Sequence, residues 1–276
     1  MGEHSWILGV VGLLAGVGAV VAWIARPVGR AVPDTLWDVP AVTRSYTTIA
    51  ASLAGFAGTS VVFVARLAVD RPGAELETVV GLLIFAFLTL LATAMQLANV
   101  PNEARSDVAF RETQRYSYLL ANASFTQALA LEWLALLPLV RIIGAMELAG
   151  ILRWVLPLAV FLAVAWLGQL IEEQTPVPRR AAVGVPVLAI VAAVLYGGLV
   201  AQWVPGLLPA DLVAMRLGAV VLASVVVGYG LQTIISALHA HGHLEGAAGV
   251  LLYRAATAQA AVAATGVSLL AIGILR

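Results

Sequence analysis

The sequence predicts an all-α, polytopic integral membrane helix bundle that forms a single transmembrane domain over residues 1–276. The chain is 62% hydrophobic and only 11% charged, whereas a soluble domain usually carries about 25% charged residues. A membrane span needs about 20 mostly apolar residues, and about eight stretches meet this requirement. They cover residues 6–25, 46–69, 76–98, 116–140, 151–171, 181–203, 216–238 and 247–275.

The first stretch is expected to be an uncleaved helix. No positive charge precedes it at residues 2–5, and Arg26 and Arg30 follow it, which is the reverse of the order in a signal peptide. Trp6 and Trp23 stand near its two ends. Their separation along a helix is about 25 Å, close to the spacing of the two interfacial aromatic belts.

The connections between the stretches are short. Residues 70–73, Asp-Arg-Pro-Gly, are a turn sequence that predicts a hairpin between the second and third stretches. Residues 99–115 and 172–180 are predicted to be hydrophilic connections. Residues 140–153 carry Arg141, Glu147 and Arg153 among Ile and Leu, which predicts a short helix lying in the membrane interface.

Orientation in a cell membrane is predicted from Arg in the short loops, because cytoplasmic loops carry the excess of positive charge. All 15 basic residues are Arg. With the N-terminus outside and eight spans, nine Arg lie inside and six outside, so an N-out arrangement is expected. A count of seven spans would move the C-terminus to the other side. The inner set is Arg26, Arg30, Arg44, Arg105, Arg111, Arg115, Arg179, Arg180 and Arg254.

Polar residues recur at helical spacing inside five of the stretches. Such stripes either let helices pack closely or line a polar cavity, and the sequence leaves both interpretations open. Gln127 lies off the stripe of its own helix. The stripes are Thr48, Ser52, Gly55, Thr59 and Arg66; Thr78, Thr89, Thr93 and Gln96; Tyr118, Asn122 and Glu132; Ser224, Gly228, Gln232 and Ser236; and Arg254, Thr257, Ala261, Thr265 and Ser268.

Seven of the polar residues are candidates for an intramembrane site: Glu132, Asn122, Gln127, Gln96, Gln232, Arg66 and Arg254. Glu132 is the foremost, because it lies about 12 Å inside the end of its helix. A charge at that depth is costly, so the carboxyl group should be neutral, paired or in contact with water. Arg66 and Arg254 are its natural partners, although each lies near a span end, from where it could reach the interface.

His239, His241 and His243 form the most distinctive local sequence. Neutral imidazoles at this spacing could bind a divalent metal such as Zn²⁺, Ni²⁺ or Cu²⁺, or they could sense pH. A solvated polar loop between the last two spans is the simpler interpretation. No predicted span contains a further His that would join such a site.

Composition excludes several kinds of chemistry. Without Lys the chain cannot hold covalent retinal or pyridoxal, because both need a Lys amine. Without Cys it has neither a disulfide nor a thiolate site. Its net charge of zero is unlike the basic surplus of a nucleic-acid-binding protein. The expected partners are therefore the lipid bilayer and either further copies of the chain or other membrane subunits.

These patterns favour a transporter or channel component for a small solute or ion. The alternative is a non-catalytic accessory or scaffold subunit of a larger membrane complex, which the small extramembrane portion fits equally well. An intramembrane enzyme is a third interpretation, and it is weaker because no predicted span holds a recognisable catalytic pair.

Overall fold

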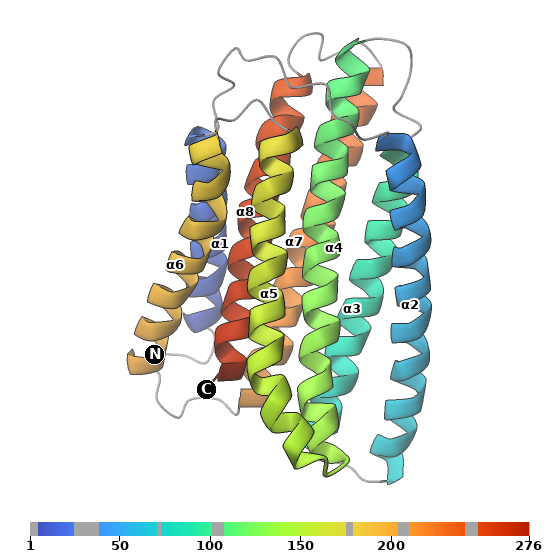
Figure 1. Ribbon diagram of the computed structural model, residues 1–276, viewed down its shortest axis with the longest axis vertical. Coiled ribbons are helices and arrows are strands. Elements are labelled where there is room, and N and C mark those ends of the chain that lie inside the picture. The colour runs from blue at the N-terminus through green and yellow to red at the C-terminus, as the bar shows by residue number, and fades with distance from the viewer. Residues whose placement is uncertain are drawn as a thin grey trace.

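The computed structural model describes residues 5–24, 39–70, 73–100, 108–174, 179–203, 210–240 and 248–275. This part of the chain is all-α, as predicted, and neighbouring helices along the sequence run in opposite directions (Figure 1). Its helices are α1 (Ser5–Ile24), α2 (Val39–Asp70), α3 (Ala74–Asn99), α4 (Val108–Ile142), α5 (Met146–Gln174), α6 (Arg179–Trp203), α7 (Ala210–Ala240) and α8 (Ala248–Leu275).

Among the residues that the structure describes, five helices are long and apolar enough to cross a membrane, so the chain is a multi-pass membrane protein by helix length and composition. The crossing segments are Ala41–Val69, Leu76–Asn99, Gln114–Ile142, Met146–Gln174 and Val250–Leu269. Eight crossings were predicted. Within the residues whose side chains the structure describes, the apolar segments of α1, α6 and α7 cover Leu8–Trp23, Ala182–Leu195 and Gly218–Ile234, each 10–17 residues long.

The outer surface of the bundle is apolar, which is the reverse of a soluble protein. Val62 on α2, Trp154 on α5 and Leu195 on α6 each expose more than 60% of their surface. Large apolar side chains in this number on all sides are stable in hydrocarbon and not in water.

α4 is the central helix. It packs against α2, α3, α5, α7 and α8 (Figure 1), and 72% of the residues in an 18-residue apolar stretch of α4 are buried, against 22% in such a stretch of α2. α1 and α6 pack on the far side of α8, whereas α2 packs mainly against α3. Residues of α4 therefore reach every side of the interior, and three of the seven intramembrane candidates, Asn122, Gln127 and Glu132, lie on this helix.

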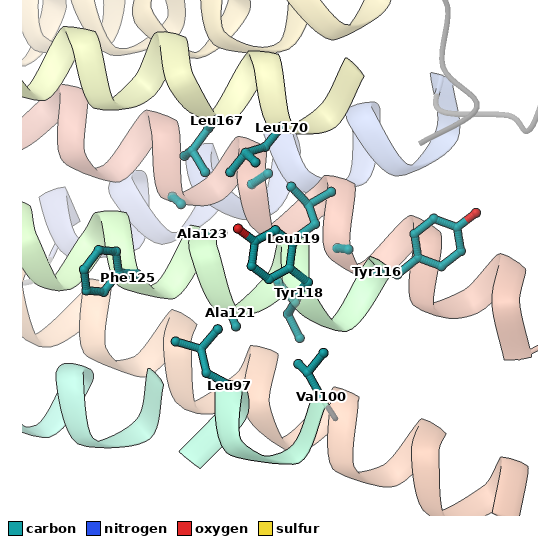
Figure 2. Close-up of a cluster of buried hydrophobic side chains, with 14 of the residues drawn as sticks. Leu97, Val100, Tyr116, Tyr118, Leu119, Ala121, Ala123, Phe125, Leu167 and Leu170 are labelled. Carbon is teal, nitrogen blue, oxygen red and sulfur yellow. The ribbon is translucent and has the colours of Figure 1, made fainter. Parts of the chain in front are cut away.

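Small side chains bring α4 and α8 close together. Ala121, Ala128, Ala260 and Ala263 are fully buried, and backbones approach most closely where side chains are small. Larger groups fill the α4–α5 contact, where Leu119 lies near Leu167 and Leu170 (Figure 2). This packing holds α4 between its neighbours.

The connection between α4 and α5 differs from the prediction. In place of a helix lying in the interface, α4 ends at Ile142 and α5 begins at Met146. Gly144 has a φ of +79°, and its N–H donates to the Arg141 carbonyl at 3.0 Å while that of Ala145 donates to the Val140 carbonyl at 3.2 Å. This pair of bonds is a Schellman motif, which ends a helix on a left-handed glycine.

Candidate functional site

The predicted polar stripe of α2 faces outward. Its members are all exposed: Thr48, Ser52, Gly55, Thr59 and Arg66. Thr48 Oγ1 donates to the Arg44 carbonyl at 3.1 Å, and Thr59 Oγ1 to the Gly55 carbonyl at 2.8 Å. Hydroxyl groups bonded to their own helix can face lipid. α2 therefore contributes no polar stripe to the interior, contrary to the cavity interpretation of this helix.

The predicted polar stripe of α3, by contrast, lies inside. Thr78, Thr89, Thr93 and Gln96 are buried. So are Asn122 and Gln127 on α4, Gln232 on α7, and Thr257, Gln259, Thr265 and Ser268 on α8. Of the five helices in the cavity interpretation, α3, α4, α7 and α8 therefore share a polar interior, whereas α2 does not contribute its stripe.

A hydrogen-bonded group joins α4, α7 and α8. Gln127 Nε2 donates to Ser224 Oγ at 2.9 Å, and Ser224 Oγ donates to the Val221 carbonyl at 2.8 Å. Gln259 Nε2 donates to the Ser224 carbonyl at 3.1 Å and lies 3.5 Å from Gln127 Oε1. Gln127 and Gln259 come from residues 132 positions apart, so these bonds fix the height of α8 against α4.

Gln259 was missed by the sequence reasoning, since it lies off the polar stripe of its helix. Its place depends on Gly228 of α7, because a Cβ at residue 228 would lie 3.1 Å from Gln259 Cδ. Gly228 was the one signal for Gln259 in the sequence, because a glycine within a helix can make room for a large polar side chain on a neighbouring helix. Sequence alone does not say which neighbour.

The contacts of Gly218 indicate that Gln96 and Gln232 lie at about the same height on α3 and α7. A Cβ at Gly218 would lie 2.9 Å from Phe85 and 3.3 Å from Leu82. Gly218 of α7 therefore lies at about the height of Leu82 and Phe85 of α3, and the two helices run in the same direction. Gln232 follows Gly218, and Gln96 follows Leu82, by the same 14 positions, or about 21 Å. Fourteen residues turn a helix through about 40° less than four full turns, so both Gln side chains remain on the facing sides.

Several buried side-chain atoms near Gln96 and Gln232, and near Ser224 further down the bundle, have no hydrogen-bond partner among the described residues. They are both amide atoms of Gln96, Oε1 of Gln232 and Oγ1 of Thr89. Thr89 lies seven positions beyond Leu82 and so is level with Ser224, six beyond Gly218. We call Thr89, Gln96, Gln127, Ser224, Gln232 and Gln259 together the amide column.

Asn122 belongs to a different side of α4. Five residues separate it from Gln127, which corresponds to about 140° around the helix. Its Nδ2 donates to the Tyr118 carbonyl at 2.9 Å, and neither its Oδ1 nor the Tyr118 hydroxyl has a partner in the described part of the chain. Tyr118 and Phe125 both meet the ring of Tyr46 edge-on, at 6.4 Å and 5.8 Å between ring centroids.

Glu132 lies on that second side as well. Tyr118, Phe125 and Glu132 follow one another at intervals of seven residues, so they form one line along α4. Glu132 is 7% exposed, and no ion pair to it forms among the residues that the structure describes. The structure therefore separates Glu132 from Gln127, by about 140° around α4.

Neither expected arginine reaches Glu132. Arg66 and Arg254 are both exposed. The ring centroids of Tyr116 and Tyr253 are 5.4 Å apart, and further along both helices Gln127 contacts Gln259. α4 and α8 therefore run in the same direction. Arg254 precedes Gln259 by five residues and Glu132 follows Gln127 by five, which puts the two charges about 15 Å apart in height.

The predicted metal site falls largely outside the described residues. His239 lies in the last turn of α7, whereas His241 and His243 lie beyond its end at Ala240. Among the side chains that the structure describes there is no group of three or more His, Asp or Glu able to hold a metal ion.

Comparison with known proteins adds no functional assignment to this geometry. A scan of known protein families, a search of curated proteins and a search of solved structures each found no match to the chain.

Proposed function

We propose that the chain is a channel or transporter component that passes a small solute along the amide column. The observation that carries this proposal is the set of unpartnered amide atoms on the buried residues Gln96 and Gln232, near the C-terminal end of α3. An unpaired buried polar group costs about 1–3 kcal/mol, so native proteins leave few such groups without a bound water, an ion or another role. A passing solute or water would supply the missing hydrogen bonds.

We further propose that all eight helices cross a cell membrane, with the N-terminus outside. α7 packs beside α3 at the same height in the bundle. α1 packs against α8 next to Val262, and α6 packs against α5 at Gly168. Each of α1, α6 and α7 thus lies beside a helix long enough to cross. A helix at that depth is surrounded by hydrocarbon or by its neighbours, so it continues through the bilayer.

Solvent access to the column tests the proposal without knowledge of the solute. The chain has no Cys, so a single introduced thiol reacts alone. A thiol reacts with iodoacetamide as the thiolate, which forms where water reaches it. We expect Gln232→Cys and Ser224→Cys in vesicles to gain the carbamidomethyl mass much faster than Val227→Cys, a lipid-facing control that is 60% exposed. Equal, slow reaction at all three positions would overturn the proposed function.

A second candidate is an accessory subunit that associates through α2. The outward stripe of this helix carries Ser52, Gly55 and Thr59, and small residues at such spacing are typical of helix–helix contacts in membranes. We propose self-association through this face. Ser52→Cys should form a disulfide-linked dimer under mild oxidation, whereas Leu162→Cys on the exposed face of α5 should not. Monomer at Ser52→Cys under the same conditions would contradict the contact.

A further inference from the structure

We infer that the solute is a small uncharged molecule that both donates and accepts hydrogen bonds, as urea, short carboxamides and small polyols do. This inference rests on the proposed function, because it names the class of solute for the same column. It follows from three features of the column: its lack of charge, the kind of atoms left unpaired and the place of the charged residues.

None of the six residues of the column ionises near neutral pH. The charged candidates lie elsewhere, because Glu132 is on another side of α4 and Arg66 and Arg254 are exposed. An ion that leaves water needs an opposite charge or a full shell of dipoles to replace its hydration. The column offers no opposite charge, so an uncharged solute enters with a much lower barrier.

The unpaired atoms are of both kinds. Gln96 presents an acceptor, Oε1, and a donor, Nε2, and Gln232 presents the acceptor Oε1. A cation site is built from oxygens that all point to the ion, and an amide N–H among them repels it. An anion would in turn be repelled by the two oxygens. A carboxamide edge is instead complementary to a molecule with one donor and one acceptor side by side.

The lower part of the column is already bonded. Gln127, Ser224 and Gln259 satisfy one another, so their amide groups are held in fixed orientations. Thr89 Oγ1 is the one unpartnered atom at this height among the column residues, and a hydroxyl can turn to donate or accept. A solute that moves from Gln96 and Gln232 to Thr89 leaves one group of hydrogen-bond donors and acceptors and meets another.

Flux through purified protein in lipid vesicles tests the inference. We would measure light scattering after mixing with urea, acetamide or glycerol, and ion flux with Na⁺, K⁺ and Cl⁻ gradients. We expect the protein to speed entry of at least one uncharged probe several-fold over empty vesicles and to leave ion flux at background. Gln96→Leu and Gln232→Leu should each reduce the uncharged flux at least threefold.

Gln169→Leu is the matched control, because Gln169 is an exposed glutamine on α5 that bonds Glu173 at 2.9 Å. It should transport as the parent does, and gel filtration of every variant checks that each folds. Ion flux without uncharged flux would overturn the solute class and leave the channel in place. No flux of any probe would overturn the class and the proposed function together, and unchanged flux in both Leu variants would overturn the role of the column.

Discussion

The two kinds of buried glutamine in this protein have opposite energetic roles. Gln96 is fully buried and neither of its amide atoms has a partner in the described part of the chain. Gln127 is equally buried, but it bonds Ser224 and lies near Gln259. A buried amide stabilises the fold only where its hydrogen bonds are made, and otherwise it destabilises.

The same replacement should therefore change stability in opposite directions at these two residues. Gln96→Leu removes an unpaired amide at similar volume, so the free energy of unfolding should rise by about 1 kcal/mol. Gln127→Leu deprives Ser224 and Gln259 of a partner and should lower it by about 1 kcal/mol. Thermal unfolding in detergent, followed by tryptophan fluorescence, measures both. A shift of the same sign in the two variants would contradict this account.

Gly228 and Gly230 offer a matched pair for the room around Gln259. A Cβ at residue 228 meets Gln259 Cδ at 3.1 Å, whereas nothing lies within 4 Å of one at residue 230. Gly228→Ala should displace the Gln259 amide and lower stability by about 1 kcal/mol. Gly230→Ala should raise it by about 0.5 kcal/mol, because Ala favours the helix. The two melting temperatures, compared in one detergent, decide the matter.

At the scale of the element, apolar length was enough to predict the helices but not which faces lie inside. Each of the eight predicted stretches overlaps an observed helix, because long apolar runs are easily recognised in a sequence. It could not tell that the stripe through Ser52 and Thr59 faces outward, whereas that through Thr89 and Gln96 faces inward. Lipid and helix interior are both apolar, so periodicity finds a stripe without giving its direction.

The turn between α4 and α5 could have been predicted better. Gly144 follows the last apolar residues of α4, which is a helix-end signal, but the charged residues around it favoured an interfacial helix. Gly144→Ala should lower stability by about 1 kcal/mol, since a left-handed conformation is unfavourable for residues with a Cβ. Gly150→Ala in α5, where nothing lies within 4 Å, should not destabilise. Melting curves of the pair separate backbone strain from a general effect of alanine.

At the scale of the whole molecule, the site arises from distant parts of the chain. Gln96, Gln127, Gln232 and Gln259 come from four different helices. Three of the four candidate amides could be chosen from the sequence, because each interrupts an apolar run. The division of the polar residues of α4 between two sides, with Gln127 on one and Asn122 and Glu132 on the other, could not be predicted, since it depends on how five helices are arranged around one.

The even number of helices makes a topological prediction. α1 begins and α8 ends at the same end of the bundle (Figure 1). If all eight cross, tags at the two termini should lie on one side of the membrane, and on the outside for the proposed orientation. Protease treatment of intact cells should remove both tags. Loss of only one tag would show an odd number of crossings.

α4 lies between two separate polar regions and contributes side chains to both. Gln127 faces one of them, and Asn122 and Glu132 face the other, about 140° away. A small rotation of this helix would carry the two regions in opposite directions across the bundle, so a change that draws Gln127 toward α3 would draw Glu132 toward α5. A change at the Glu132 carboxyl group that turned α4 would therefore also move the Gln127 amide.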